Sequence, residues 1–387
     1  MITFPDLPTV VRGVAELEST PRGTRLHRLP SWVRQQFPDG QLLAMESQSS
    51  GVRLVFRTDA TAIDLVTHPT RVAYRGVTRA RGCVDVHVNG VLASRDVLAD
   101  GDLVTVDLET GHTSYAAGAS HTTTVSDLPG DGSSVEIWLP HNESIELVEL
   151  RANAPIVDDT TSSPRWTHHG SSISHGSNAT APSEIWPAVA ARLAGVELRN
   201  LGFGGSAIVD PFMARVIRDT DADVISVKLG INVVNLDAMR LRAFVPAIHG
   251  FLDTIRDGHP DTPLLLVSPL FCGIHESTPG PGAVDTSTIG TDGVRFIATG
   301  DPETVAQGRL TLQVIRHELE SLAARRADPN LHYLDGTVLY GAADSVDLPL
   351  TDGLHPGPAA HRRIGERFAA AVFTEHAPFG RVRALPR

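Results

Sequence analysis

A serine, an aspartate with a nearby histidine, an asparagine and a pair of glycines are the residues of this chain whose types fit one reaction together. Asp352 precedes His355 by three residues, and Ser172, Gly204–Gly205 and Asn232 lie far upstream. A serine that attacks an acyl carbonyl needs a base to take its proton and hydrogen-bond donors to stabilise the charge that develops on the carbonyl oxygen. The set therefore contains what acyl transfer through a serine requires, provided that the fold brings these positions together.

The second half of the chain predicts a fold that would do so. Uninterrupted apolar runs such as LLLV and VISV are typical of strands buried on both faces, and they alternate here with helical patterns. This alternation predicts an α/β domain with a parallel, doubly wound sheet. The expected strands are residues 165–170, 196–203, 221–230, 262–270 and 331–336, and the expected helices are residues 182–195, 236–257, 303–326 and 358–373.

Each residue of the set comes just after one of these strands. In an open parallel sheet, ligands bind in the crevice beyond the carboxyl ends of the strands. Ser172 follows the first expected strand, Gly204–Gly205 the second and Asn232 the third. Asp352 and His355 come between the last strand and the last helix. Each residue alone has an ordinary explanation as a turn or cap residue, but their joint occurrence at strand ends favours a catalytic site.

The first half of the chain, residues 1 to about 150, is short on helical periodicity and rich in alternation. Its segments of period-2 or β-branched character are separated by glycine, aspartate and serine at the spacing of a sandwich or barrel. We expect an antiparallel, jelly-roll-like β-sandwich, whose role is either structural or ligand binding. The expected strands are residues 51–58, 61–68, 83–90, 103–108, 135–140 and 144–151.

The length of the chain also predicts two domains. A chain of 387 residues exceeds the size at which one hydrophobic core usually keeps growing. The segment 151–163 is polar, contains a proline and has neither the strand nor the helix period, which is typical of a connection. We therefore expect the sandwich over residues 1–150, a linker over residues 151–163 and the catalytic domain over residues 164–387.

The second domain resembles the SGNH hydrolase (GDSL esterase/lipase) family, whose four blocks carry Ser, Gly, Asn and Asp-x-x-His in this order. The blocks here are GSSIS, NLGFGGSA, LGINVV and TDGLHPG, and the resemblance covers residues 164 to 375. Ser171 stands where the common pattern has an aspartate, as in a subset of carbohydrate-esterase-like members, and Val233 replaces the aspartate that usually follows the asparagine. The resemblance implies a flavodoxin-like SGNH hydrolase fold. Members with an N-terminal sandwich act as esterases or deacetylases, often on sugars.

The resemblance also implies a role for each residue of the set. Ser172 would be the nucleophile, His355 the base that takes its proton, and Asp352 the carboxylate that holds the imidazole in the right tautomer. The oxyanion hole would consist of the backbone N–H groups of Ser172 and Gly205 and the side-chain amide of Asn232. Such a mechanism requires no metal and no organic cofactor.

Three further histidines flank the candidate nucleophile. His168, His169 and His175 raise the alternative of a metal site, but no acidic or cysteine companion has a matching spacing. Strand packing or pocket lining fits them better. His169, which directly precedes Gly170, is a candidate for shaping the substrate pocket.

The segment 271–302 is long, rich in glycine, proline and threonine, and follows a strand at the active edge. Loops of this length without regular structure are usually functional or disordered. We expect it to shape the acyl or leaving-group pocket, with His275 and Glu276 as candidates for substrate contact. A mobile surface loop is the competing interpretation.

Composition excludes several other classes of protein. The formal net charge is -12 and no basic cluster stands out, which argues against a nucleic-acid partner. The start of the chain lacks a basic region followed by an apolar one, and no apolar run reaches about 18 residues, so we expect a cytoplasmic protein with no membrane partner. Cys83 and Cys272 lie far apart, which indicates neither a disulfide framework nor a cysteine metal site.

The sequence thus predicts a serine esterase that hydrolyses a short-chain ester, an acetyl ester in the first instance, of a carbohydrate or natural product through an acyl-enzyme on Ser172. Two alternatives stay open. One is an acyltransferase that uses the same acyl-enzyme, and the other is a catalytically silent carbohydrate-binding protein. The expected partner is a small-molecule ester, and the patterns carry no signal for an oligomeric state.

Overall fold

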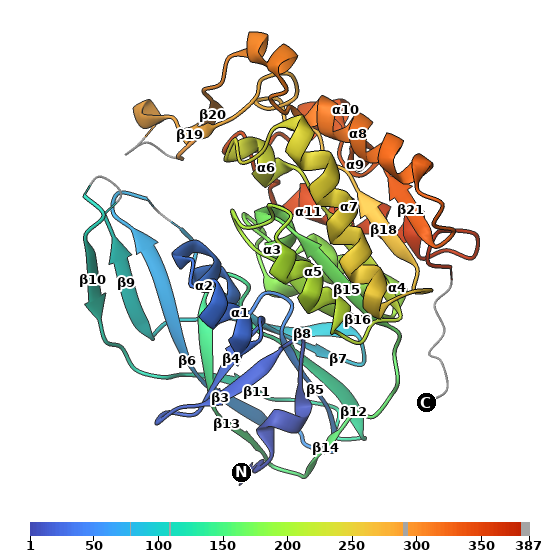
Figure 1. Ribbon diagram of the computed structural model, residues 1–387. Helices are drawn as coiled ribbons and strands as arrows, with labels where there is room; N and C mark the ends of the chain where they lie inside the picture. Colours follow the sequence, from blue (N-terminus) through green and yellow to red (C-terminus); the bar gives the residue numbers. More distant parts are fainter. Residues whose placement is uncertain (78, 108–109, 289–292, 381–387) are drawn as a thin grey trace. The chain divides into compact units, whose positions relative to one another are not determined.

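The computed structural model describes residues 1–77, 79–107, 110–288 and 293–380, and the chain divides into two units (Figure 1). One unit comprises Met1–Ser162 with Ala181–Ser183, and the other comprises Ser163–Thr180 with Glu184–Arg387. The segment 151–163, expected to be a linker, is partly strand, because it holds the end of β13 (Ser144–Ala152) and all of β14 (Ile156–Asp158). Leu108 of an expected strand and residues 289–292 of the expected loop lie outside the described residues.

Two sheets make up the N-terminal unit, and their strands pair antiparallel except for β6 with β9, within the described residues. Three helical turns, η1 (Leu7–Val10), α1 (Ser31–Gln36) and α2 (Gly40–Glu46), accompany them. The first sheet has the order β10 (Thr113–Ala116), β9 (Asp102–Val106), β6 (Ile63–Tyr74), β13, β4 (Thr24–His27) and β3 (Glu16–Ser19), with β1 (Ile2–Thr3) on β13 and β11 (His121–Val125) on β6. The second has the order β14, β5 (Arg53–Thr58), β12 (Ser133–Trp138), β7 (Cys83–Val88) and β8 (Val91–Val97), with β2 (Val11–Arg12) on β5.

Apolar side chains from both sheets meet in one core. Alternate residues of a strand point to the same face of its sheet, so one face of each sheet can be apolar throughout. Phe56 and Ile137 of the second sheet and Leu65 and Leu150 of the first are no more than 1% exposed and belong to the same buried cluster. The expected antiparallel, sheet-rich N-terminal domain is therefore confirmed.

The second unit contains a five-stranded parallel sheet. Its order is β16 (Glu197–Gly202), β15 (Arg165–Gly170), β17 (Val224–Lys228), β18 (Leu264–Val267) and β21 (Leu331–Leu334). The strands β17 and β18 are buried along their whole length, as their apolar runs predict. The first strand along the chain lies between the second and the third, which places a topological switch point at the carboxyl ends of β15 and its neighbours.

Helices cover both faces of this sheet (Figure 1). On one face, Trp166 of β15 contacts the rings of Trp186 in α4 (Trp186–Ala194) and Phe368 in α11 (Pro358–Val372). On the other, His169 stacks on Phe251 of α7 (Leu241–Gly258), against which α5 (Pro211–Arg218) and α8 (Leu312–Arg325) pack. The expected doubly wound α/β fold is therefore confirmed. The remaining elements are α3 (Ser172–His175), α6 (Ile231–Asn235), α9 (Gly336–Leu339), α10 (Ala342–Asp347), β19 (Gly282–Val284), β20 (Phe296–Ala298), η2 (Pro182–Glu184), η3 (Thr286–Thr288) and η4 (Pro302–Gln307).

The helix expected at 303–326 begins later in the structure for a local reason. Residues before it form η4, and the chain then turns at Gly308, whose φ is +88°, a value that favours glycine. Thr311 provides the true N-cap, because its hydroxyl accepts a hydrogen bond from Val314 N at 3.3 Å. In the described part of the chain, no helix combines the length and apolar character needed to cross a membrane. Cys83 and Cys272 are both buried, and within the described residues neither forms a disulfide.

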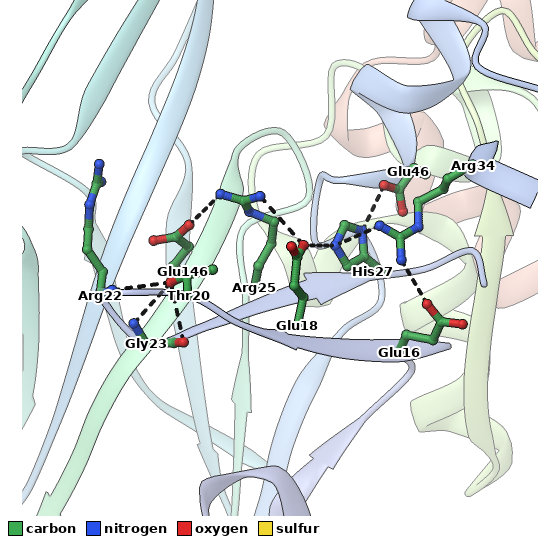
Figure 2. Close-up of polar contacts among 10 residues, drawn as sticks. All are labelled: Glu16, Glu18, Thr20, Arg22, Gly23, Arg25, His27, Arg34, Glu46 and Glu146. Atoms are coloured by element: carbon green, nitrogen blue, oxygen red, sulfur yellow. Dashed lines mark hydrogen bonds and ion pairs between the residues drawn. The ribbon is translucent and has the colours of Figure 1, made fainter. Parts of the chain in front are cut away.

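A charged network connects α1 and α2 with β3 and β4 in the N-terminal unit (Figure 2). The side chain of His27 is only 6% exposed, and its Nδ1 and Nε2 lie 2.9 Å from the carboxylates of Glu46 and Glu18 respectively. Arg34 pairs with Glu16 at 2.7 Å and lies 3.0 Å from His27 Nε2. Burial alone would lower the pKa of His27, but the two carboxylates outweigh it, so that pKa is raised.

We expect the pairing of His27 with its two carboxylates to stabilise the protein more at mildly acidic pH than at alkaline pH. A raised pKa in the folded state means that the contribution is fully present below the ordinary histidine pKa of about 6.5 and is lost as the pH rises through the raised value. His27→Gln should lower the free energy of unfolding by about 2 kcal/mol near pH 6 and by clearly less near pH 9, because charged hydrogen bonds are lost only where the ring is protonated. Urea unfolding of parent and variant measures this difference. An equal cost at both pH values would contradict the prediction.

Candidate active site

The candidate nucleophile begins a short helix at the carboxyl end of β15. Ser171 is the N-cap of α3, and its hydroxyl accepts a hydrogen bond from Ile173 N at 3.4 Å. Ser172 is the first residue of the helix, a position whose N–H has no intrahelical acceptor. Ser171 is fully buried. The residue that departs from the common family pattern therefore acts here as a cap for the turn that presents Ser172.

A continuous line of hydrogen-bonding contacts joins the three residues of the predicted triad. Ser172 Oγ lies 2.9 Å from His355 Nε2, and His355 Nδ1 lies 2.7 Å from Asp352 Oδ2. The side chains of His355 and Asp352 are 12% and 17% exposed. Because Asp352 can only accept from Nδ1–H, the neutral ring has its Nε2 lone pair directed at the serine hydroxyl, as a general base requires. The structure thus brings together residues 183 positions apart in the sequence.

The carboxylate of Asp352 is held within its own turn. Its Oδ1 accepts from the backbone N–H groups of Leu354 at 2.9 Å and His355 at 2.7 Å, and this leaves Oδ2 for the imidazole. Burial would raise the pKa of Asp352, but its hydrogen bonds and its attraction to His355 lower that pKa to about 2. Asp352 is therefore ionised at any pH at which a histidine base would operate.

The hairpin of β19 and β20 packs on this turn. Phe296 N donates to Asp352 O at 2.8 Å, and the Phe296 ring meets the His355 ring edge-on at a centroid distance of 5.6 Å. Gly353 has a φ of +80°, and a Cβ there would lie 3.1 Å from Phe296 O, so both the conformation and the close approach favour glycine. The loop that is predicted to lie near the pocket therefore contacts the turn of Asp352 and His355 through Phe296, a residue for which the sequence contains no local signal.

The predicted oxyanion donors come just after three neighbouring strands of the same sheet, β15, β16 and β17. Asn232 is 4% exposed, and its Oδ1 accepts a hydrogen bond from Ala207 N at 3.1 Å. This contact fixes the side-chain amide so that its NH2 group points away from Ala207. Gly205 has a φ of +72°, which favours glycine. Among the described residues, no acceptor pairs with the backbone N–H of Ser172 or of Gly205. These groups are therefore available to an anion.

A buried asparagine links the turn that begins with Ser172 to the end of β16, just before the loop that carries Gly205. Asn200 Nδ2 donates to Ser174 O at 2.9 Å, and Asn200 Oδ1 accepts from Gly202 N at 3.0 Å. Gly202 allows the close approach, since a Cβ there would lie 2.5 Å from His175 N. The sequence contains no signal for this bridge, because it joins segments 26 residues apart through one side chain.

The three residues predicted to contact substrate are engaged within the α/β unit. His169 is 0% exposed and donates from Nδ1 to Leu201 O at 2.7 Å. His275, also 0% exposed, lies 3.2 Å from both Thr278 O and Asn235 Oδ1. Glu276 is 9% exposed, accepts from Cys272 N and pairs with Arg316. Their role in substrate contact stays a prediction. The contacts that these three side chains make in the structure join them to the sheet and to the segment 271–302.

His168 and His175 also have partners of their own. His168 lies between the hydroxyls of Ser226 and Ser174, at 2.7 and 2.8 Å. His175 Nδ1 lies 3.2 Å from Gly202 O. In the described ranges, no three His, Cys, Asp or Glu side chains are grouped so that they could hold a metal ion.

Comparisons with known proteins match both halves of the chain. A model of the GDSL-like Lipase/Acylhydrolase family matches residues 169–363, and a model of the SsfX3 N-terminal domain matches residues 10–148. A comparison with curated proteins finds no match.

Solved structures resemble the chain over most of its length. The salicylyl-acyltransferase SsfX3 from a tetracycline biosynthetic pathway is 27% identical, with 92% of each chain covered and a TM-score of 0.75. A protein from Bacteroides ovatus ATCC 8483 described as a GDSL-like lipase is 16% identical, with 96% of this chain and 97% of that chain covered and a TM-score of 0.67. A family two carbohydrate esterase from Clostridium thermocellum is 13% identical, with 94% and 98% covered and a TM-score of 0.55. Because the family model spans half of its residues, including all four blocks, this chain belongs to the GDSL-like lipase/acylhydrolase family.

Proposed function

We propose that this protein is a serine esterase that removes a short acyl group, such as acetyl, from a hydroxylated carbohydrate or natural product. The observation that carries the proposal is the line of contacts from Ser172 Oγ through His355 to Asp352, with distances of 2.9 and 2.7 Å. Nucleophile, base and orienting carboxylate lie within hydrogen-bond reach of one another, which is the geometry of acyl transfer.

The proposed reaction proceeds in two halves. Ser172 Oγ attacks the ester carbonyl while His355 Nε2 takes its proton, and the charge on the carbonyl oxygen is stabilised by the N–H groups of Ser172 and Gly205 and the amide of Asn232. The tetrahedral intermediate collapses, and His355 gives the proton to the departing alcohol. Water then attacks the acyl-enzyme with His355 again as base, which releases the acid and restores Ser172. Asp352 remains ionised throughout and stabilises the imidazolium.

A second candidate is transfer of the acyl group to an acceptor other than water. It is favoured by the likeness to SsfX3, a salicylyl-acyltransferase, which extends over 92% of both chains at 27% identity. An acyltransferase and an esterase share the first half-reaction and differ only in what attacks the acyl-enzyme. Support for a natural product as substrate comes from the same likeness.

Partition of the acyl-enzyme separates the two candidates. The protein is incubated with p-nitrophenyl acetate or p-nitrophenyl salicylate, alone and with an excess of a phenolic or sugar alcohol. For an esterase, we expect free acid to account for the released p-nitrophenol whether or not the alcohol is present. A transferase would instead give acylated alcohol as the main product, and the release of p-nitrophenol would become faster as the concentration of the added alcohol rises. Absence of turnover with both esters would overturn the proposal.

A further inference from the structure

We propose that Asn178 is a positioning residue for the catalytic carboxylate, whose amide holds Asp352 Oδ2 in line with His355. The inference rests on the proposed function of the triad. Asn178 Nδ2 donates to Asp352 Oδ2 at 3.1 Å and lies 3.5 Å from Thr351 Oγ1. The oxygen that receives this amide is the one that accepts from His355 Nδ1 at 2.7 Å.

The amide supplies a donor that the catalytic turn lacks. Oδ1 of Asp352 has two backbone donors from its own turn, Leu354 N and His355 N. Oδ2 has His355 and, among the described residues, only Asn178 besides. An ionised carboxylate oxygen can accept two hydrogen bonds, so Asn178 fills the position beside the imidazole and opposes rotation of the carboxylate.

The contact also joins the two segments that form the triad. Asn178 lies six residues after Ser172, and the amide therefore connects the nucleophile segment to the Asp-x-x-His turn independently of the contact between serine and histidine. A second link is adjacent, because His361 Nε2 of α11 donates to Ser177 O at 2.9 Å. Together they fix residues 177–178 against the segment that carries the base.

Asparagine suits this position for two separate reasons. Its φ is +67°, in the left-handed region that asparagine, aspartate and glycine tolerate best. Of these three residues only asparagine also offers a neutral donor to a carboxylate. Glycine would keep the backbone and remove the donor, and aspartate would keep the shape and place a second negative charge beside Asp352. The two substitutions therefore separate the effect of the backbone conformation from the effect of the amide donor.

The test measures kcat, KM and the pH profile of kcat/KM with p-nitrophenyl acetate for Asn178→Gly and Asn178→Asp. We expect Asn178→Gly to lower kcat about tenfold with KM changed less than about twofold, since it removes one charged hydrogen bond from the triad. Asn178→Asp should lower kcat further and move the acid limb of the profile to higher pH, because added negative charge favours the protonated, inactive imidazole. Asn89→Gly, at another asparagine with positive φ in the N-terminal unit, serves as the matched control and should leave kcat unchanged.

Two results would overturn the inference. One is an unchanged kcat in Asn178→Gly. The other is a loss of activity that follows a fall in melting temperature while the acid limb of Asn178→Asp stays in place, which indicates a structural role alone. Ser172→Ala in the same assay keeps the proposed function separate. Turnover that depends on Ser172 but is indifferent to Asn178 contradicts only the positioning role, whereas turnover that survives Ser172→Ala contradicts the proposed function itself.

Discussion

Replacing Ser172 with alanine is expected to lower kcat/KM for p-nitrophenyl acetate by about a thousandfold or more while the fold is kept. Ser172 is the predicted nucleophile, and its Oγ lies 2.9 Å from His355 Nε2. Loss of one member of a serine triad typically costs between about 10⁴ and 10⁶ in kcat. The residual rate would come from the oxyanion donors and substrate binding. Steady-state kinetics and a melting curve of the purified variant measure both effects.

Two further variants test whether the loss of activity is specific to Ser172 and its contact with His355. His355→Ala in the Ser172→Ala background should cause almost no additional loss, because residues that act as a unit have strongly non-additive effects. Ser171→Ala should lose no more than about tenfold in kcat. Among the described residues its side chain makes a single cap contact of 3.4 Å, and caps contribute about 1 kcal/mol to stability. Comparable losses in Ser171→Ala and Ser172→Ala would contradict the assignment of the nucleophile.

Acidification from about pH 6.5 to about pH 4 is expected to destabilise the α/β unit by several kcal/mol, because three of its buried histidines are neutral. Burial lowers the pKa of His169 and of His361 to about 4, and the pKa of His168 falls well below its ordinary value for the same reason. The charge of Lys228, whose own pKa burial lowers to about 8, disfavours protonation of all three rings.

The hydrogen bonds of these rings agree with a neutral state. His361 Nε2 donates to Ser177 O at 2.9 Å while its Nδ1 accepts from Trp186 N at 3.3 Å, so a second ring proton would face an N–H group. His169 donates from Nδ1 to Leu201 O, and its buried Nε2 has no partner among the described residues. Protonation of either ring would therefore leave a buried N–H without an acceptor.

The loss of stability in acid arises because the unfolded chain binds protons on these histidines at a higher pH than the folded chain. The unfolded chain takes up a proton on each histidine near pH 6.5 and the folded chain only near pH 4 for His169 and His361, so their contribution is complete above about pH 6.5 and is lost as the pH falls toward 4. A shift of this size corresponds to about 3 kcal/mol for each ring. Two rings together correspond to about 6 kcal/mol, which is comparable with the lower end of the stability of a typical domain, about 5–15 kcal/mol.

Calorimetry at several pH values tests this expectation, with His361→Gln as the matched variant. Glutamine can accept from Trp186 N and donate to Ser177 O, yet it does not titrate. We expect the melting temperature of the parent to fall steeply below about pH 6.5. The melting temperature of the variant should fall less steeply, because the variant takes up one proton fewer on unfolding. Parallel curves for parent and variant would show that His361 does not carry the effect.

Features with a local signal could be predicted from the sequence. The apolar runs VISV and LLLV become the buried strands β17 and β18, because strands covered on both faces need apolar side chains at every position. The candidate triad could also be predicted, since strand ends in a parallel sheet meet at one edge. Strands such as β10 could not, because all four of its residues are exposed and no alternation marks them.

Features that depend on the fold could not be predicted from the sequence. Asn178 and Phe296 contact the turn of Asp352 and His355 across long stretches of chain, and neither stands in a pattern that differs from an ordinary loop. For His169, His275 and Glu276, the sequence predicts the position but not the contacts. Their position near the active edge is visible in the sequence, but whether such a side chain faces a ligand or a buried partner depends on packing that no sequence window contains.

Covalent labelling identifies directly which serine of this protein is the nucleophile. The protein is treated with a serine-directed fluorophosphonate, which bonds an activated serine oxygen with loss of fluoride, and is then digested with trypsin and sequenced by mass spectrometry. We predict one adduct, on Ser172 within the peptide spanning residues 166–192, formed in step with the loss of esterase activity and absent from His355→Ala. An adduct on any other serine, or full activity in a protein labelled at Ser172, would contradict the account.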